Sequence, residues 1–169
     1  MEQPSKTQFL QTELAAALAS LVSEDGDFTV FDDVQVFRRS APTPLMHGES
    51  SVSYCAIGQG AKHVEIGDFS YVYGPENLLI TSIEMPMVSR VVEASEDKPY
   101  LSMTLDLNPG LVRSVIVGSS ASQFGGDADL CAHKVKPMEV GLLDATVRLM
   151  QSINNPAEAA YLVPMIKQE

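Results

Sequence analysis

The chain has 169 residues, of which 45% are apolar and 20% charged, and its formal net charge is -11. This balance is typical of one globular domain and excludes a disordered chain. The acidic excess, with no run of basic residues and no long apolar stretch, argues against direct binding to DNA and against a membrane association.

The first predicted element is a helix from Thr7 to Val22, where apolar residues recur at helical spacing. A β-rich region follows, from about 28 to 107, with short strands separated by tight turns. Segments 62–66 and 69–73 are predicted to form a hairpin, and Gly67-Asp68 is its two-residue turn. Strands at this spacing predict a β-barrel or a sandwich.

The last strand of this region alternates apolar and polar residues from Tyr100 to Leu107. Because successive side chains of a strand point to opposite faces, Leu101, Met103, Leu105 and Leu107 are expected to face a core.

After Leu107 the hydrophobic pattern changes to a helical period. Asn108-Pro109 is expected to begin a short helix that ends near Val117, and Ser119 to Lys136 is expected to be a loop or a weak strand. A longer helix is predicted from Pro137 to Ile153, and another from Ala157 to Ile166.

No catalytic or metal-binding motif emerges. A metal-binding cupin needs a cluster of His and Glu ligands, whereas His47, His63 and His133 are scattered singly. His63 and Glu65 share one strand face but have no second His beside them, so we interpret them as solvent-facing. The sequence contains no nucleophile motif and no glycine-rich phosphate cradle, and we therefore predict no catalytic residue, no metal and no cofactor.

Two cysteines, Cys55 and Cys131, lie far apart and form no CxxC pair. The first residues lack the charged and apolar regions of a signal peptide. We therefore expect a cytoplasmic protein with reduced thiols.

Arg90 is the single candidate for ligand binding. If Glu93 faces water, strict alternation places Val88, Arg90 and Val92 on the apolar side of their strand. A buried guanidinium is costly unless it is paired, and it binds a carboxylate or a phosphate in a bidentate fork. The alternatives are a β-bulge that turns Arg90 outward and a structural pair with an acid.

The helix predicted from 137 to 153 has apolar residues on more than one side. A helix that is apolar over a wide arc needs a second partner, so we predict that Leu142, Leu149 and Met150 lie in a dimer interface. The alternative is that the N-terminal helix covers the second side.

A series of short motifs runs in order through the middle of the chain. These motifs are Cys55 to Lys62, which ends in Gln-Gly-x-Lys, the turn 66–68, Tyr71 to Pro75, Leu78 to Pro86, Val91 to Ser95 and Lys98 to Leu101. The loop 41–44 and the segment 142–145 fit the same pattern. No single motif is decisive, but the ordered series resembles the N-terminal domain of AraC-type transcription regulators.

This resemblance implies a fold that is mainly β: a cupin-like β-barrel of jelly-roll type over about 28–107, an N-terminal helix, and helices over about 108–169. It implies one regulatory domain over 1–169, a small-molecule effector or protein partner, and a homodimer. DNA would be read by helix-turn-helix units absent from this chain. It implies no enzyme activity. The rival interpretations are a small cupin-type enzyme and a dimerisation module without a ligand.

Overall fold

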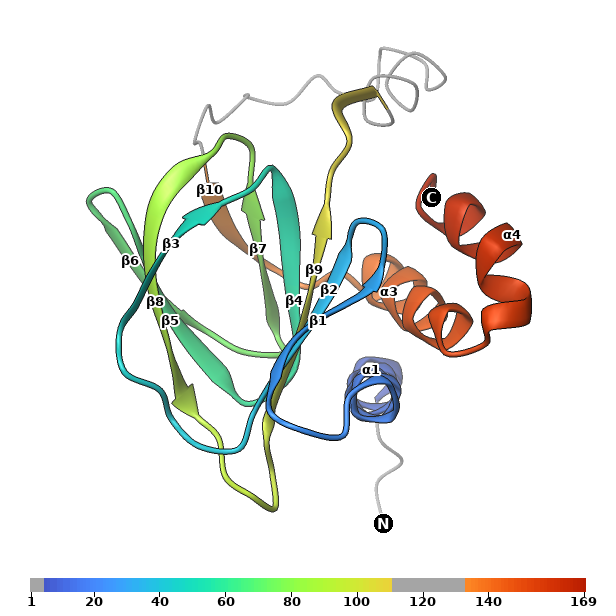
Figure 1. Cartoon of the computed structure of the whole chain (residues 1–169), viewed down its shortest axis with the longest axis horizontal. Coiled ribbons are helices and arrows are strands. Elements are labelled where there is room, and N and C mark those ends of the chain that lie inside the picture. The colour runs from blue at the N-terminus through green and yellow to red at the C-terminus, as the bar shows by residue number, and fades with distance from the viewer. Residues whose placement is uncertain (1–4, 111–132) are drawn as a thin grey trace.

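The computed structural model describes residues 5–110 and 133–169, and its strands form two antiparallel sheets that face each other (Figure 1). The strands are β1 (Gly26–Phe31), β2 (Val34–Arg39), β3 (Met46–Ser50), β4 (Ser53–Gln59), β5 (Ala61–Ile66), β6 (Phe69–Tyr73), β7 (Asn77–Thr81), β8 (Met85–Glu93), β9 (Tyr100–Asp106) and β10 (His133–Pro137). The larger sheet has the order β1-β2-β9-β4-β7-β10, and the smaller sheet has the order β3-β8-β5-β6.

Three helices of the described part cover the outer face of the six-stranded sheet: α1 (Lys6–Leu21), α3 (Val140–Ile153) and α4 (Pro156–Ile166) (Figure 1). A capping box begins α1. The Gln8 amide donates to the Ser5 hydroxyl at 3.2 Å, and the Gln8 side chain accepts from the Ser5 amide at 2.9 Å. No helix in these residues is long and apolar enough to cross a membrane.

The six-stranded sheet is buried on both faces. Leu101, Met103 and Leu105 of β9 are buried, as predicted, and they pack in the core beneath the helices. Tyr100 and Ser102 point the other way and are also buried, because the smaller sheet covers that side. A second apolar core therefore fills part of the space between the sheets, and it is formed by Cys55, Ile57, Val64, Ile66, Tyr73, Leu79, Val91 and Tyr100.

Gly58 allows α1 to lie close against β4. A Cβ atom at this position would come within 2.9 Å of Leu18 Cδ1 and 3.1 Å of the Ala15 Cα. The backbone of α1 can thus lie closer to β4 than a residue with a side chain at position 58 would allow, and the packing of this helix on the sheet depends on that contact.

Several predicted elements are confirmed, including the N-terminal helix and the β5–β6 hairpin, whose turn residue Gly67 has a φ of 57°. Pro109 and Gly110 are helical, as predicted, and the Asn108 side chain accepts from the Gly110 amide at 2.7 Å, whereas the rest of that predicted helix (111–117) and most of the segment 119–136 lie outside the described residues. The start predicted for the next helix is wrong: α3 begins at Val140, because Pro137 belongs to β10 and the Met138 amide bonds to the Glu76 carbonyl at 2.9 Å. Strand β3 was not predicted.

The mainly β fold with helices at both ends is confirmed, whereas a closed barrel is not. Within the described residues, each strand belongs to one sheet or the other, and no ladder of hydrogen bonds joins the two. The strands therefore form two facing sheets with separate edges, and a space can open between those edges.

Candidate functional site

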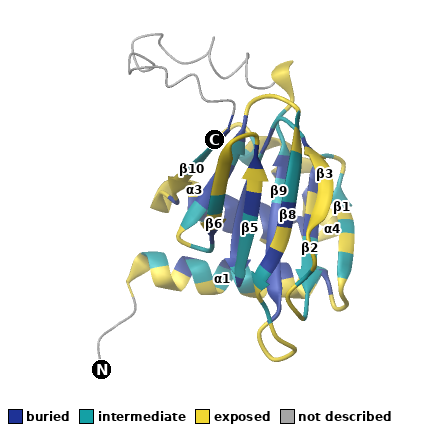
Figure 2. Ribbon diagram, turned by 90° about the vertical axis from the view of Figure 1, so that its left-hand side faces the viewer, coloured by how far each residue is buried: buried dark blue, intermediate teal, exposed yellow. Residues whose placement is uncertain are grey.

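The principal candidate site is a cavity of about 500 Å³ between the two sheets. It opens at the edge where β1 and β2 of the larger sheet face β3 of the smaller one. Asp27 and Gln35 on one side of this mouth are exposed, and so are Met46, His47 and Glu49 on the other. Figure 2 shows β3 as a largely exposed strand at the edge of the smaller sheet.

The opposite edge of the sandwich is closed by aromatic side chains. Phe69 and Tyr71 of β6 contact the His133 ring of β10 edge-on, with ring centroids 5.0 and 6.0 Å apart. This contact bridges the two sheets, and His133 itself is 6% exposed. The interior is therefore accessible from the side of β2 and β3.

Two buried phenols lie at the apolar end of the interior. Tyr73 and Tyr100 are each 2% exposed, and neither hydroxyl has a hydrogen-bond partner in the described part of the chain. Burial raises the pKa of both phenols well above the ordinary value, and the neighbouring Cys55 raises both further. These groups stay neutral at physiological pH and remain available as hydrogen-bond donors.

The other end of the cavity has a wall of hydroxyl groups that bond to one another. The Ser51 hydroxyl donates to Asp106 at 2.5 Å, Ser53 lies 3.2 Å from the Thr81 hydroxyl, and Thr81 donates to the Ser51 carbonyl. Ser50 likewise bonds to the Met85 carbonyl at 3.3 Å. This wall is polar, but most of its bonding capacity is already used.

Two cations line the cavity and differ in their surroundings. Arg39 donates to the carbonyls of Gly26 at 2.8 Å and Arg38 at 2.7 Å and to the carboxylate of Asp27 at 2.5 Å, so its guanidinium holds the β1–β2 edge together. Lys62 lies on β5 in phase with the buried Val64, and its ammonium has no bond to any described residue.

The inward orientation predicted for Arg90 is wrong. Arg90 is exposed on the outer face of β8 and does not line the cavity, whereas Ser89 and Val91 face inward and are buried. The reason is a bulge: Ala61 pairs with Glu93 and Lys62 pairs with Val91, which leaves Val92 without a partner. Glu93 therefore does not set the phase of the residues before it, and the outward alternative holds.

The predicted dimer residues separate into two groups. Leu149 is 2% exposed and Met150 is 0% exposed, and both pack in the core that α3 shares with α1 and the sheet. Their assignment to a dimer interface is wrong, because the N-terminal helix covers the second apolar side of α3. Leu142 is 37% exposed and remains open to a partner.

The three histidines do not converge. His63 faces outward, bonds to the Ser70 hydroxyl at 2.8 Å and lies 3.7 Å from Glu65. His133 lies between the aromatic rings of β6, and His47 lies on the exposed strand β3. Among residues 5–110 and 133–169, no three His, Cys, Asp or Glu side chains are grouped as a metal site would require.

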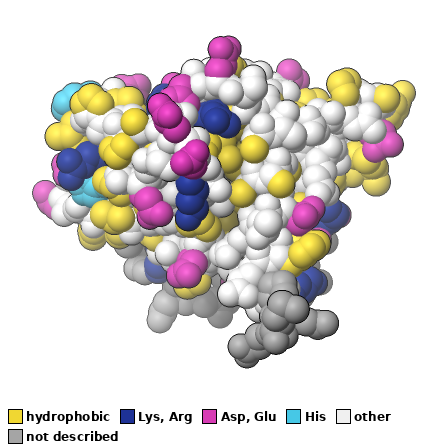
Figure 3. All heavy atoms as spheres, turned by 90° about the horizontal axis from the view of Figure 1, so that it is seen from below, with side chains coloured by type: hydrophobic (Ala, Val, Ile, Leu, Met, Phe, Trp, Pro, Cys, Tyr) yellow, Lys and Arg dark blue, Asp and Glu magenta, His cyan; other side chains and the backbone are white. Residues whose placement is uncertain are grey.

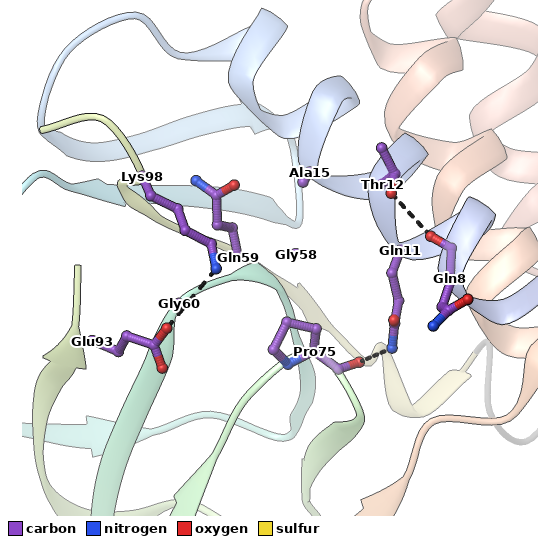
Figure 4. Close-up of a pocket in the computed structure, with 10 residues that line it drawn as sticks. All are labelled: Gln8, Gln11, Thr12, Ala15, Gly58, Gln59, Gly60, Pro75, Glu93 and Lys98. Carbon is purple, nitrogen blue, oxygen red and sulfur yellow. Dashed lines mark hydrogen bonds and ion pairs between the residues drawn. The ribbon is translucent and has the colours of Figure 1, made fainter. Parts of the chain in front are cut away.

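A second hollow, of about 380 Å³, lies outside the sheets between α1 and the β4–β5 turn (Figure 4). Its polar groups bond mainly to one another or to backbone. Gln11 donates to the Pro75 carbonyl at 3.2 Å, and Lys98 pairs with Glu93 at 4.0 Å. This groove offers a ligand fewer free groups than the cavity between the sheets.

The match to a family model places the chain in a class of regulators. The model described as AraC-type transcriptional regulator N-terminus matches residues 31–169, and the chain belongs to that family. The protein is thus built as the N-terminal regulatory domain of an AraC-type transcription regulator. No curated protein sequence matches it closely enough to count as a relative.

Solved structures agree with this fold. The unsaturated fatty acid-bound form of wild-type ToxT from Vibrio cholerae strain SCE256 aligns with a TM-score of 0.54 at 10% identity, over 85% of this chain and 53% of that one. An apo variant of ToxT from the same strain aligns with a TM-score of 0.50 at 9% identity, over 82% and 54%. The chain spans about half the length of these proteins, and at such identity the likeness concerns the fold alone.

Sequence reasoning missed Lys62 as a site residue. A signal was present, because Lys62 alternates with Val64 and Ile66, both 0% exposed, and a strand places such residues on one face. Tyr73 and Tyr100 carried no comparable local signal, since aromatic residues are common in ordinary strands.

Proposed function

We propose that this chain binds a small-molecule effector in the cavity between its two sheets and that this binding biases the arrangement of a homodimer. The main support for this proposal is the cavity itself. Its volume of about 500 Å³ falls within the usual size of ligand pockets, and it combines apolar walls with a few free polar groups. The fatty acid held by ToxT supports a small organic molecule as the class of effector.

A thermal-shift screen of small organic molecules tests the sensing role. A ligand present at about a hundred times its dissociation constant should add about 2.7 kcal/mol to the free energy of unfolding. We expect a hit to lose its effect when Ser89→Phe fills the cavity, because Ser89 is buried and lines it. A hit that stabilises this variant equally would place the binding elsewhere and contradict the proposal.

The proposed dimer uses α3 and α4, which lie on the side away from the smaller sheet (Figure 1). Their exposed apolar side chains are Val140, Leu142, Tyr161, Leu162 and Met165. Lys167 fixes the end of α4 by pairing with Asp33 and by lying 4.9 Å from the centre of the Phe31 ring. A helix held in this way presents its outer face in one orientation.

The remaining features of the proposal follow from the regulator class. The two sheets correspond to a cupin-like jelly roll without metal chemistry, and the chain has no enzymatic role. In this proposal DNA is contacted by a part of the regulator outside this chain, and the protein acts in the cytoplasm. Elemental analysis of chelator-free protein should give less than one equivalent of zinc, iron, nickel or manganese, and one tightly held equivalent would favour the cupin enzyme instead.

A further inference from the structure

The cavity contains one positively charged side chain that forms no hydrogen bond or ion pair with the described residues. Lys62 faces inward from the middle of the smaller sheet, in register with Tyr73 on one side and Val91 on the other. Its ammonium has no partner in the parts of the chain that the structure describes. The other interior cation, Arg39, is bonded to Asp27 and to two carbonyls.

A second donor without a partner in the described residues comes from Tyr73, which pairs with Lys62 across the strands and lines the same cavity. The Tyr73 hydroxyl is buried on the strand that neighbours Lys62, and no described group accepts from it. An unpaired buried hydroxyl costs about 1–3 kcal/mol, so a ligand that accepts this bond recovers part of that cost. An ammonium has only donors and a phenol has one donor, and a single acceptor-rich group can satisfy both.

The acidic groups of the cavity do not compete for Lys62. Asp27 is engaged with Arg39, Asp106 accepts the Ser51 hydroxyl, and Glu49 lies at the exposed mouth. The adjoining walls are apolar and include Phe37, Leu79 and Met87. The cavity therefore pairs a cationic, donor-rich point with room for an apolar body.

We propose that this cavity binds a small organic anion, with the carboxylate, sulfonate or phosphate of the ligand at Lys62 and the Tyr73 hydroxyl, and with its apolar body against Phe37, Leu79 and Met87. The inference rests on the proposed sensing function and adds the chemical class of the ligand.

A pair of fluorescent probes separates charge from apolar contact. 1-Anilinonaphthalene-8-sulfonate carries a sulfonate, and N-phenyl-1-naphthylamine has the same ring system without the charge. The chain has no Trp, so the fluorescence of either probe is measured without a Trp background. We expect the sulfonate probe to bind about ten times more tightly or better, because charge-assisted hydrogen bonds in a desolvated site are strong.

Lys62→Met keeps the length of the side chain and removes its charge. It should weaken the sulfonate probe by about tenfold or more and leave the neutral probe unchanged, whereas Lys62→Arg should retain most of the preference. Tyr73→Phe should weaken the sulfonate probe by about threefold or more. Arg90→Met is the matched control, because Arg90 is exposed on the outer face of the neighbouring strand. Melting curves of each variant confirm that it folds.

The outcomes distinguish this inference from the function on which it rests. Binding of both probes with equal affinity, or a sulfonate probe that binds a folded Lys62→Met variant as tightly as the unmodified chain, would overturn the anion while leaving a cavity that binds ligands. Equal losses in Lys62→Met and Arg90→Met would show a general charge effect and would also overturn it. Failure of both probes to bind the unmodified chain would contradict the anion and the sensing role together.

Discussion

At the scale of single residues, Gly60 fixes the backbone beside the proposed ligand site. Its φ is 83°, a conformation that L-residues with side chains rarely adopt, and it lies in the turn between β4 and β5 directly before the bulge opposite Lys62. A Cβ atom here would clash with the Glu93 carbonyl oxygen and lie 3.1 Å from the Tyr100 Cα. The orientation of Lys62 therefore depends on a residue that does not itself line the cavity between the sheets.

We predict that Gly60→Ala lowers the free energy of unfolding by about 2 kcal/mol or more, through the positive φ and the backbone clash together. Urea denaturation followed by circular dichroism measures this change. Gly48→Ala is the control, because no atom of the described residues lies within 4 Å of a Cβ placed there and its φ is not positive. Equal effects of the two substitutions would contradict the role of Gly60.

The buried phenols predict how stability changes at alkaline pH. Burial raises the pKa of Tyr73 and Tyr100 in the folded chain above their unfolded value of about 10. Above that pH the unfolded state loses these protons while the folded state keeps them, so the contribution is complete below about pH 10 and falls as the pH rises further. We expect the double variant Tyr73→Phe, Tyr100→Phe to lose less stability between pH 9 and 11 than the unmodified chain.

Absorbance titration of the tyrosines checks the same point independently. Because burial raises the pKa of Tyr73 and Tyr100, these two phenols should ionise only when the chain unfolds. Ionisation of all the tyrosines near pH 10 with the fold intact would refute the prediction. At neutral pH, Tyr73→Phe should raise the free energy of unfolding by about 1 kcal/mol or more, because it removes a buried hydroxyl that has no partner among the described residues.

At the scale of elements, the burial of the apolar side chains of α3 depends on packing against α1, which the sequence of α3 alone does not indicate. Leu149 is 2% exposed within one chain, so Leu149→Glu places a charge in the core between these helices and the sheet. We predict a loss of about 4 kcal/mol or more and loss of the cooperative melt. Leu142→Glu, seven residues earlier on the same helix and 37% exposed, should fold and melt nearly as the unmodified chain does.

Elements with a strong local pattern could be predicted from the sequence. The Ala-rich helix, the hairpin with Gly67 at its turn and the alternation of Leu101, Met103 and Leu105 all depend on interactions between near neighbours. The edge strand β3 has no such pattern. Its residues are mostly exposed, and it exists because Met46 to Ser50 pair with β8 far along the chain.

The site was harder to predict because side-chain direction depends on register. One unpaired residue, Val92, shifts the alternation of the β8 residues before it, so that Ser89 and Val91 face inward and Arg90 faces outward. Likewise, the burial of Leu149 depends on a helix more than a hundred residues earlier in the chain, and its own periodicity cannot distinguish a partner helix in the same chain from one in a second copy.

At the scale of the whole molecule, the formal net charge is -11. On the face shown in Figure 3, Lys and Arg side chains lie among acidic ones and form no continuous basic patch. We therefore predict that this chain alone does not retard duplex DNA at moderate salt, as a gel-shift assay can show. Salt-sensitive binding in the micromolar range or tighter would contradict this prediction and the assignment of DNA contacts to another part.

Self-association is the last property of the whole molecule that the structure predicts. Tyr161 is 75% exposed and Met165 is 66% exposed, one helical turn apart on α4, and Leu162 and Leu142 are partly exposed on the same pair of helices. Figure 3 shows apolar side chains gathered at the right-hand end of the molecule, where α4 lies in Figure 1. A twofold contact between two copies would remove these side chains from water, and a stable one buries about 800 Å² on each partner.

Sedimentation at tens of micromolar should therefore show a dimer. The double variant Tyr161→Glu, Met165→Glu should sediment as a monomer with an unchanged circular dichroism spectrum, because both side chains are exposed in the single chain and four added charges repel one another across the axis. Val72→Glu is the matched control: Val72 is 66% exposed but lies on β6 of the other sheet, and the dimer should persist. A monomer for the unmodified chain, or dissociation by Val72→Glu alone, would show that α4 is not the surface through which two copies meet.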